Sequence, residues 1–235
     1  VYASYKLVFV ESGLALNDTW SVWVYGLTAY GSLFNETLTA PAGESIVFYL
    51  EPGSYRFIIN PVFGYSSTPV NGVVAVSSAG SVTIPVNFTL INYPVAINVT
   101  NMVSGMNIKA MVRGETIAGT MVNQELTLMV PYYTIMLPDG EYTLTIIDVT
   151  YGSYDKVASP TLNNVTFTVW GGARVVNVTL STNYYPVKVS ETGLINNVKW
   201  SLSVSGVFFN GTHYSYATTL ISPSDSVTLM LPDGS

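Results

Sequence analysis

Hydrophobic and polar residues alternate along several short stretches of the chain. The clearest is residues 82–90, VTIPVNFTL, in which every second residue is apolar. An alternation with period two puts one set of side chains in a core and the other in water, so this stretch predicts a half-buried β-strand. Residues 165–169 and 200–205 show the same pattern. Because Pro85 has no backbone N–H, we expect the strand at 82–90 to be an edge strand or to have one side free.

Other apolar runs have the length of strands and are separated by Gly, Pro, Asn and Asp. In the first third of the chain they are residues 5–10, 20–25, 46–50, 55–59 and 73–76. Short strands with turn residues at roughly 8 to 12 residue spacing predict a β-sandwich or barrel. No stretch has a helical period, so the pattern indicates an all-β chain.

One segment of this pattern recurs along the chain. Glu11–Gly26, ESGLALNDTWSVWVYG, is written again at Glu191–Gly206 as ETGLINNVKWSLSVSG. A weaker copy lies between them at Val99–Gly114, with Ile108 at the position of Trp20. Self-similarity over a long period predicts a tandem array of like units.

The repeats divide the chain into three units, residues 1–91, 92–183 and 184–235. Units two and three open on the same Tyr-Pro-Val sequence, and both contain a Leu-Pro-Asp-Gly turn. We predict tandem immunoglobulin-like β-sandwiches: two complete seven-stranded sandwiches and an incomplete third. The connectors at 91–92 and 181–184 are too short to act as flexible tethers, so neighbouring units should stack with limited freedom.

The two ends of the sequence have their own interpretation. The sequence itself contains no signal-peptide pattern, so we expect Val1 to be a mature N-terminus or a cut point. The third unit stops inside a turn at Ser235. An incomplete sandwich exposes edges that a donated strand can fill, so residues 1–10 of one copy are a candidate donor strand for the last unit of another. Truncation of a longer chain explains the same ending.

Composition narrows the class of function. Only 9% of residues are charged, against about a quarter in ordinary domains, and the net charge is −6. There is no basic stripe for a phosphate backbone, so nucleic acid is disfavoured as a partner. No apolar run reaches the roughly 18 to 20 residues that a membrane-spanning helix needs, so we expect no membrane span in these residues.

Seven Asn-X-Thr triplets form the main candidate modification sites. This is roughly twice the number that chance predicts from the Ser and Thr content. We expect N-linked glycans on these residues and no cofactor. A Thr-rich β protein that collects triplets by accident is the alternative. The seven acceptors are Asn17, Asn35, Asn87, Asn98, Asn164, Asn177 and Asn210.

No arrangement of residues points to catalysis or to a metal site. The Asp-Thr/Ser-Gly loop of aspartic proteases is absent, and Asp139 and Asp233 belong to hairpin turns. His213 is the only histidine, the chain has no Cys, and there is no Gly-x-Ser-x-Gly elbow. Asp148 and Asp155 lack the dense acidic spacing of a calcium loop. We therefore predict no catalytic and no metal-binding residues.

The aromatic residues of the repeated segment fall on both faces of its strand. Alternation directs Trp20 and Trp200 inward and puts Trp23 and Tyr25 on the outer face. In the third unit serines replace the two outer aromatics. Trp23 and Tyr25 are thus a candidate contact face for another subunit or for a sugar. The alternative is packing against a loop of the same unit.

The pattern E-S/T-G-L…W-S-x-x-V-x-G, followed by a Leu-Pro-Asp-Gly turn, resembles repeats of archaeal secreted proteins. These include S-layer and filament subunits and accessory regions of thermopsin-like proteases. The resemblance covers all three units and implies an extracellular archaeal setting. Ala15 and Ile195 stand where the repeat usually has Pro, so the likeness is to a repeat type, which does not fix a function.

Together these features predict a non-enzymatic structural subunit of an archaeal extracellular assembly. The assembly would be a pilus-like surface filament or an S-layer, with copies of the same chain as main partners and other cell-surface proteins as a second class. Strand donation is one route of assembly. The alternatives are an accessory module of a secreted thermopsin-like protease and a carbohydrate-binding adhesin.

Overall fold

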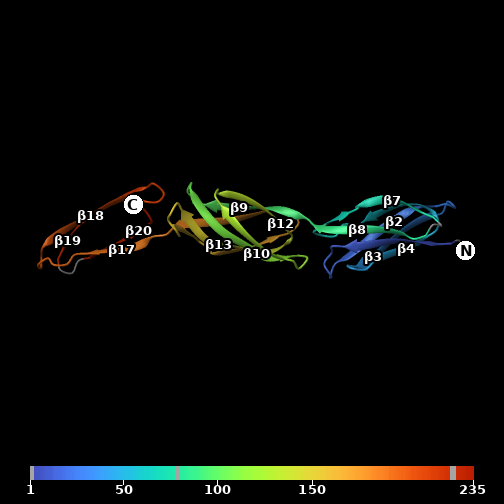
Figure 1. Cartoon of the computed structure of the whole chain (residues 1–235), viewed down its shortest axis with the longest axis horizontal. Coiled ribbons are helices and arrows are strands. Elements are labelled where there is room, and N and C mark those ends of the chain that lie inside the picture. Colours follow the sequence, from blue (N-terminus) through green and yellow to red (C-terminus); the bar gives the residue numbers. More distant parts are fainter. Residues whose placement is uncertain (1–2, 78–79, 223–225) are drawn as a thin grey trace.

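The computed structural model describes residues 3–77, 80–222 and 226–235, and all regular secondary structure in these residues is β-strand. The predicted all-β class of tandem β-sandwiches is confirmed. The strands fall into three sets, which follow one another along the chain and lie in a row (Figure 1). We call these sets unit 1, unit 2 and unit 3.

Unit 1 is a sandwich of two four-stranded sheets. One sheet has the strand order β4-β1-β8-β6 and the other β3-β2-β5-β7. Strands β1 and β8 are parallel, and the other neighbours are antiparallel. The strands are β1 (Tyr5–Ser12), β2 (Thr19–Thr28), β3 (Leu33–Pro41), β4 (Ile46–Leu50), β5 (Gly53–Ile59), β6 (Tyr65–Thr68), β7 (Asn71–Val76) and β8 (Val82–Leu90).

Unit 2 repeats this topology with the orders β12-β9-β16-β14 and β11-β10-β13-β15. Strands β9 and β16 form its parallel pair. The strands are β9 (Asn92–Thr100), β10 (Met106–Thr116), β11 (Met121–Leu128), β12 (Tyr132–Pro138), β13 (Gly140–Tyr151), β14 (Ala158–Pro160), β15 (Asn164–Val169) and β16 (Arg174–Thr182).

Unit 3 contains the counterparts of the first four strands of the other units. Strand β17 pairs with β20, and β18 pairs with β19. These two pairs form separate two-stranded sheets in the described part of the chain. The strands are β17 (Tyr185–Ser190), β18 (Lys199–Val207), β19 (His213–Ile221) and β20 (Ser226–Leu231).

The prediction of seven strands in each complete unit is wrong by one, because units 1 and 2 have eight strands each. In unit 1 the apolar runs do not reveal β3 and β6. Strand β3 is mostly polar and exposed, and only Ala40 is fully buried. Strand β6 has four residues, of which Tyr65 alone is buried. Strands with so little apolar surface carry almost no alternating signal.

Each complete unit has its own apolar core between its two sheets. In β8, Val86 and Phe88 are buried while Asn87 and Thr89 are exposed, as the alternation predicts. Strand β8 is not an edge strand, since it lies between β1 and β6. Its pairing with β6 nevertheless ends at Asn87, so that side of the strand is free at Pro85. The second of the two expectations for Pro85 is therefore the correct one.

The candidate donor segment lies within unit 1 itself. Residues 1–2 of this segment fall outside the described residues, and the rest runs into β1. Strand β1 has β4 on one side and β8 on the other, and its side chains Leu7 and Phe9 are completely buried. Donating this segment to another copy would remove a central strand from its own sheet.

A buried tyrosine closes the β4–β5 turn of unit 1 and its counterpart in unit 2. The hydroxyl of Tyr55 donates to the carbonyl of Glu51 at 2.7 Å, and that of Tyr142 donates to Pro138 at 2.9 Å. Burial raises the pKa of Tyr142 to about 12, and the nearby charge of Asp139 adds to the rise. A neutral phenol is therefore strongly preferred at this position.

We predict that unit 2 loses stability as the pH rises from about 10 to about 12. The unfolded state releases the Tyr142 proton near the ordinary tyrosine pKa, whereas the folded state holds it to higher pH. The contribution of this proton is complete below pH 10 and declines through the window. Denaturant unfolding at a series of pH values measures it. In Tyr142→Phe, which cannot ionise there, the decline should be shallower; equal slopes for the two proteins would contradict the prediction.

Candidate functional site

The glutamate that opens the repeated segment ties two turns together. In unit 1 the carboxylate of Glu11 accepts hydrogen bonds from the backbone N–H of Leu14 at 2.8 Å and of Gly43 at 2.7 Å. The first belongs to the β1–β2 turn and the second to the β3–β4 turn. A carboxylate that accepts two backbone donors satisfies groups that these turns would otherwise leave unpaired.

The same device recurs in unit 3 and is replaced in unit 2. Glu191 accepts from the backbone N–H of Leu194 at 3.2 Å and from the hydroxyl of Ser222. At the corresponding position of unit 2, Val99 is 2% exposed and belongs to the core. An apolar contact therefore stands in place of the carboxylate in the middle copy of the segment.

The glycine that ends the segment makes room for the buried tyrosine. A Cβ on Gly26 would lie 2.4 Å from the carbonyl oxygen of Ser54 and 3.1 Å from the Tyr55 ring. Gly114 has the same relation to Tyr142. Trp20 is 1% exposed, as expected, whereas Trp200 is only half-buried. The opening glutamate, Trp20 and the closing glycine of the segment are thus accounted for by packing and turn geometry.

Unit 2 reaches into the base of unit 1 through its β10–β11 hairpin. Ile117 and Ala118, at the tip of this hairpin, pack against the core of unit 1. The contact is close, since a Cβ on Gly64 would lie 2.3 Å from the Ile117 side chain. Beside it, the rings of Phe63 and Trp170 lie 4.6 Å apart. The junction is therefore an apolar contact between the ends of two sandwiches.

Asp139 holds the unit 2 side of this junction in place. It is completely buried, its carboxylate accepts from the backbone N–H of Gly171 at 2.6 Å, and its carbonyl accepts from Ile117 at 2.9 Å. The second carboxylate oxygen is buried and has no hydrogen-bond partner among the described residues. One residue of the Leu-Pro-Asp-Gly turn thus fixes both the hairpin tip and the loop after β15.

The junction between units 2 and 3 uses the same construction. Phe209, in the β18–β19 hairpin, is 6% exposed and belongs to the core cluster of unit 2, with its ring 5.6 Å from that of Tyr151. Its N–H donates to the carbonyl of Asp233 at 2.7 Å, as that of Ile117 does to Asp139. The connector is held as well, because Asn183 donates its N–H to the carbonyl of Val157 at 3.0 Å.

We call this hairpin residue the plug position; it is Ala29 in unit 1, Ile117 in unit 2 and Phe209 in unit 3. Ala29 donates to the carbonyl of Pro52 at 2.6 Å, so the hairpin geometry is the same in all three units. In unit 1 the plug position is exposed. Around it lie Leu27 and Leu33, which are cross-strand partners and are 53% and 85% exposed. Unit 1 therefore presents an uncovered apolar hairpin end.

The sequence did not single out the plug positions. A period-two pattern reports burial between the two sheets of one unit, and a hairpin tip lies outside that pattern. The available signal was a large apolar residue, Ile117 or Phe209, two positions before the turn glycine, where polar residues are usual.

All seven acceptor asparagines lie in the described residues, and six of them are exposed, while Asn98 is half-buried. Asn98 and Asn177 are directly opposite each other on β9 and β16, and the amide nitrogen of Asn98 donates to the side-chain oxygen of Asn177 at 3.1 Å. These two acceptors are therefore close neighbours.

Trp23 and Tyr25 lie where the alternation puts them, on the outer face of the β3-β2-β5-β7 sheet. Both are half-buried, and their rings stack on each other with centroids 4.5 Å apart. The indole N–H of Trp23 donates to the side-chain oxygen of Asn35 at 2.7 Å. The two candidate contact residues are thus in contact with a candidate glycosylation site, a proximity that the alternation along the sequence does not reveal.

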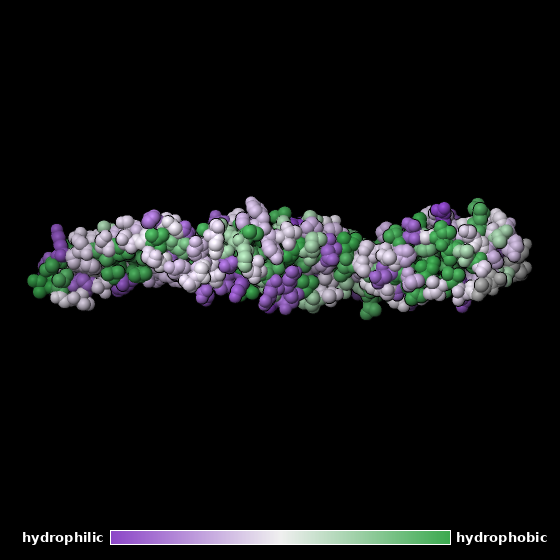
Figure 2. Space-filling view, turned by 45° about the horizontal axis from the view of Figure 1, so that its top comes forward, coloured by the Kyte–Doolittle hydropathy of each residue, from purple (hydrophilic) through white to green (hydrophobic). Residues whose placement is uncertain are grey.

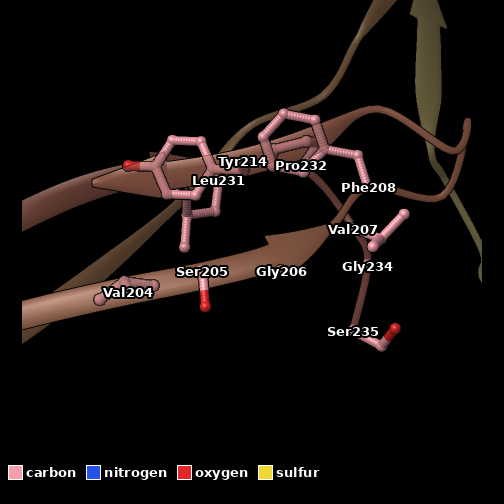
Figure 3. A pocket seen from close by; sticks show the side chains of 10 residues that line it. All are labelled: Val204, Ser205, Gly206, Val207, Phe208, Tyr214, Leu231, Pro232, Gly234 and Ser235. Carbon is pink, nitrogen blue, oxygen red and sulfur yellow. The ribbon is translucent and has the colours of Figure 1, made fainter.

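The described residues contain no cluster of side chains arranged as a metal-binding site. No group of three His, Asp or Glu side chains there could hold a metal ion. A pocket of about 200 Å³ at the end of unit 3 is lined by apolar and small residues, including Phe208, Tyr214 and Leu231 (Figure 3). It also borders Gly206, the counterpart of Gly26 and Gly114, against which Tyr55 and Tyr142 pack in the complete units.

The outer surface mixes apolar and polar residues with few charges. Figure 2 shows both kinds interspersed over the visible face of all three units, with apolar residues gathered on unit 1. The described residues contain no helix that is long and apolar enough to cross a membrane.

Comparison with known proteins shows the fold. No protein-family model matches the sequence, and a search of curated proteins found no match. Among solved structures, the Bacillus anthracis TIE protein superposes with a TM-score of 0.59 over 97% of this chain at 12% identity. The chain spans 44% of the length of that protein. At this identity the likeness supports the tandem β-sandwich architecture.

Two pilins are further matches. A streptococcal ancillary pilin covers 75% of this chain and 62% of its own length, with 17% identity and a TM-score of 0.32. GBS52, the minor pilin of Streptococcus agalactiae, covers 76% of this chain and 96% of its own length, with 11% identity and a TM-score of 0.30. At these TM-scores the two matches support no conclusion about this chain.

We predict that Phe209→Ala loosens the junction between units 2 and 3 and lowers the stability of unit 2. Truncating a buried Phe costs roughly 3 to 5 kcal/mol, and here the cavity opens in the unit 2 core. Denaturant unfolding and limited proteolysis of the connector measure the two effects. Phe208→Ala is the matched control, because Phe208 stacks on Tyr214 inside unit 3. A control that destabilises unit 2 as much as Phe209→Ala would contradict the plug role.

Proposed function

We propose that the chain is a non-enzymatic structural subunit of an archaeal extracellular assembly, either a surface filament or an S-layer. The observation that carries the proposal is the repeated plug junction, in which the hairpin of one unit enters the base of the unit before it. Contacts of this kind add units in a row without a new type of interface. A chain built in this way is suited to span distance.

The surface of the described residues is compatible with life outside the cell. Six exposed Asn-X-Thr acceptors and very few charges leave hydroxyls, amides and any attached glycans to hydrate the surface. N-linked glycans on these acceptors are part of the proposal, and so is the extracellular location. The archaeal origin is supported by the resemblance of the repeated segment.

We further propose that the partners are copies of the same chain that meet end to end. The uncovered hairpin end of unit 1 carries the geometry that units 2 and 3 use at their junctions, with Leu27 and Leu33 exposed beside Ala29. Apolar surface of this kind at a structural end favours a like partner. Donation of residues 1–10 is the second route of assembly, and it requires β1 to leave the middle of its sheet.

A carbohydrate-binding adhesin is the second candidate function. Its support is the stacked Trp23–Tyr25 pair on the outer face of unit 1, since aromatic rings are common in sugar-binding surfaces. Binding of the purified protein to a glycan array, lost in Trp23→Ala, would favour this function. The third candidate function is that of an accessory module of a secreted thermopsin-like protease. A catalytic domain encoded in the same gene would favour this hypothesis.

Electron microscopy of the purified protein tests the proposal. We expect filaments or lattices, and we expect Leu33→Asp to reduce them strongly because it puts a charge into the end-to-end contact. Val175→Asp is the matched control, since Val175 is also an exposed apolar residue but lies on strand β16 of unit 2, away from the hairpin end of unit 1. Dispersed particles under all assembly conditions, or equal effects of the two substitutions, would count against end-to-end assembly.

A disulfide separates the two routes of assembly. The chain has no Cys, and Val8 and Val47 are cross-strand partners on the outer face of β1 and β4. In the double variant Val8→Cys/Val47→Cys, oxidation locks β1 into its own sheet. End-to-end packing predicts that oxidised protein still assembles. Assembly only after reduction would instead favour strand donation.

A further inference from the structure

The acceptor triplet at Asn35 faces the aromatic pair directly. In the register of β2 and β3, Asn35 is opposite Tyr25 and Thr37 is opposite Trp23. Side chains two residues apart share one face of a sheet, so all four lie on the outer face of unit 1. Both residues of the triplet that N-glycosylation requires are therefore next to the two rings.

The side-chain amide of Asn35 is hydrogen-bonded to one of the two rings. The indole N–H of Trp23 donates to the side-chain oxygen of Asn35 at 2.7 Å, which fixes the plane of the amide. The amide nitrogen, to which a sugar would be linked, makes no hydrogen bond to any described residue. By contrast, Asn98 uses its amide nitrogen as a donor to Asn177. The amide nitrogen of Asn35 is thus without a partner among the described residues, and it belongs to the residue directly opposite Tyr25.

The other units provide an internal comparison. At the same cross-strand position unit 2 has Asn123 opposite Arg113, and the guanidinium donates to the Asn123 side-chain oxygen at 3.1 Å. Glu125 takes the place of Thr37, so this Asn is not an acceptor, and Met111 takes the place of Trp23. Unit 3 has serines opposite each other. The aromatic pair occurs in the one unit whose residue at this position begins an acceptor triplet.

We propose that the N-linked glycan of Asn35 folds back onto Trp23 and Tyr25 and packs its first sugar against them. A pyranose ring has an apolar face of C–H groups, and covering half-buried rings with it removes apolar surface from water. Trp23 and Tyr25 then bind the glycan that the same chain carries on Asn35. The inference rests on the extracellular, glycosylated state in the proposed function and names one site at which the glycan stabilises the fold.

The experiment compares protein from an N-glycosylating host with protein from a host that lacks the pathway. Thr37→Ala removes the acceptor triplet but keeps Asn35 and its bond to Trp23. In glycosylated protein it should lower the Tm of unit 1 by roughly 4 to 8 °C, as expected for the loss of one modest contact in a domain of this size. In unglycosylated protein the same substitution should leave Tm nearly unchanged.

Two controls isolate the sugar-on-ring contact. Thr166→Ala removes the acceptor at Asn164, which lies on β15 of unit 2, and should leave the Tm of unit 1 unchanged in both hosts. In the Trp23→Ala background, Thr37→Ala should no longer have an effect specific to glycosylated protein. In NMR spectra the protons of the first sugar on Asn35 should be shifted by the ring currents, and Trp23→Ala should return them to ordinary positions.

Several results would overturn the inference. Unshifted sugar protons would do so, as would an equal effect of Thr37→Ala in the two hosts. Glycopeptide mass spectrometry that finds other acceptors occupied and Asn35 empty would also overturn it, and would leave the proposed function intact. Absence of glycan at all seven acceptors in the native protein would overturn both this inference and the glycosylated state in the proposed function, whereas filament formation is scored separately by microscopy.

Discussion

The structure depends on covering the open ends of its sandwiches with apolar side chains. A sandwich buries the inner faces of its two sheets, but the ends of that core are exposed unless loops or a neighbour cover them. Here Ile117 closes the base of unit 1 and Phe209 that of unit 2. Each plug residue donates a backbone hydrogen bond to the aspartate of the Leu-Pro-Asp-Gly turn in its own unit. The hairpin that carries the plug residue is therefore held by its own unit while its tip enters the core of the preceding one. This constraint makes the units a continuous stack.

The ends and the sides of the units therefore have different roles in our account. The ends carry the contacts between neighbouring units, and the sides carry strand acceptors such as Asn35 together with the Trp23–Tyr25 pair. Two acceptors lie in turns instead: Asn17 between β1 and β2, and Asn210 directly after Phe209 in the β18–β19 hairpin. A row of units stacked end to end fits the proposed surface assembly.

The sequence predicted what depends on burial within a unit. The alternation in β8, the inward Trp20, the outward Trp23 and the division into tandem sandwiches follow from period-two patterns and from the repeated segment. It did not predict features that depend on neighbours. The plug residues lie in turns, and the bond from Trp23 to Asn35 follows from the register of β2 and β3. The contact between Asn98 and Asn177 follows from the register of β9 and β16 in the same way. Asn87, which matches Asn177 in the sequence repeat, is instead opposite Ser12 on β1.

The most direct test of this account is the relative orientation of units 1 and 2 in solution. Residual dipolar couplings measured for backbone amides of both units in a weakly aligned sample report whether the two share one alignment frame. A junction held by Ile117 and Asp139 predicts a single alignment tensor that fits both units in the arrangement of the structure. Two tensors of clearly different magnitude would show that the units move independently and would contradict the plug junction.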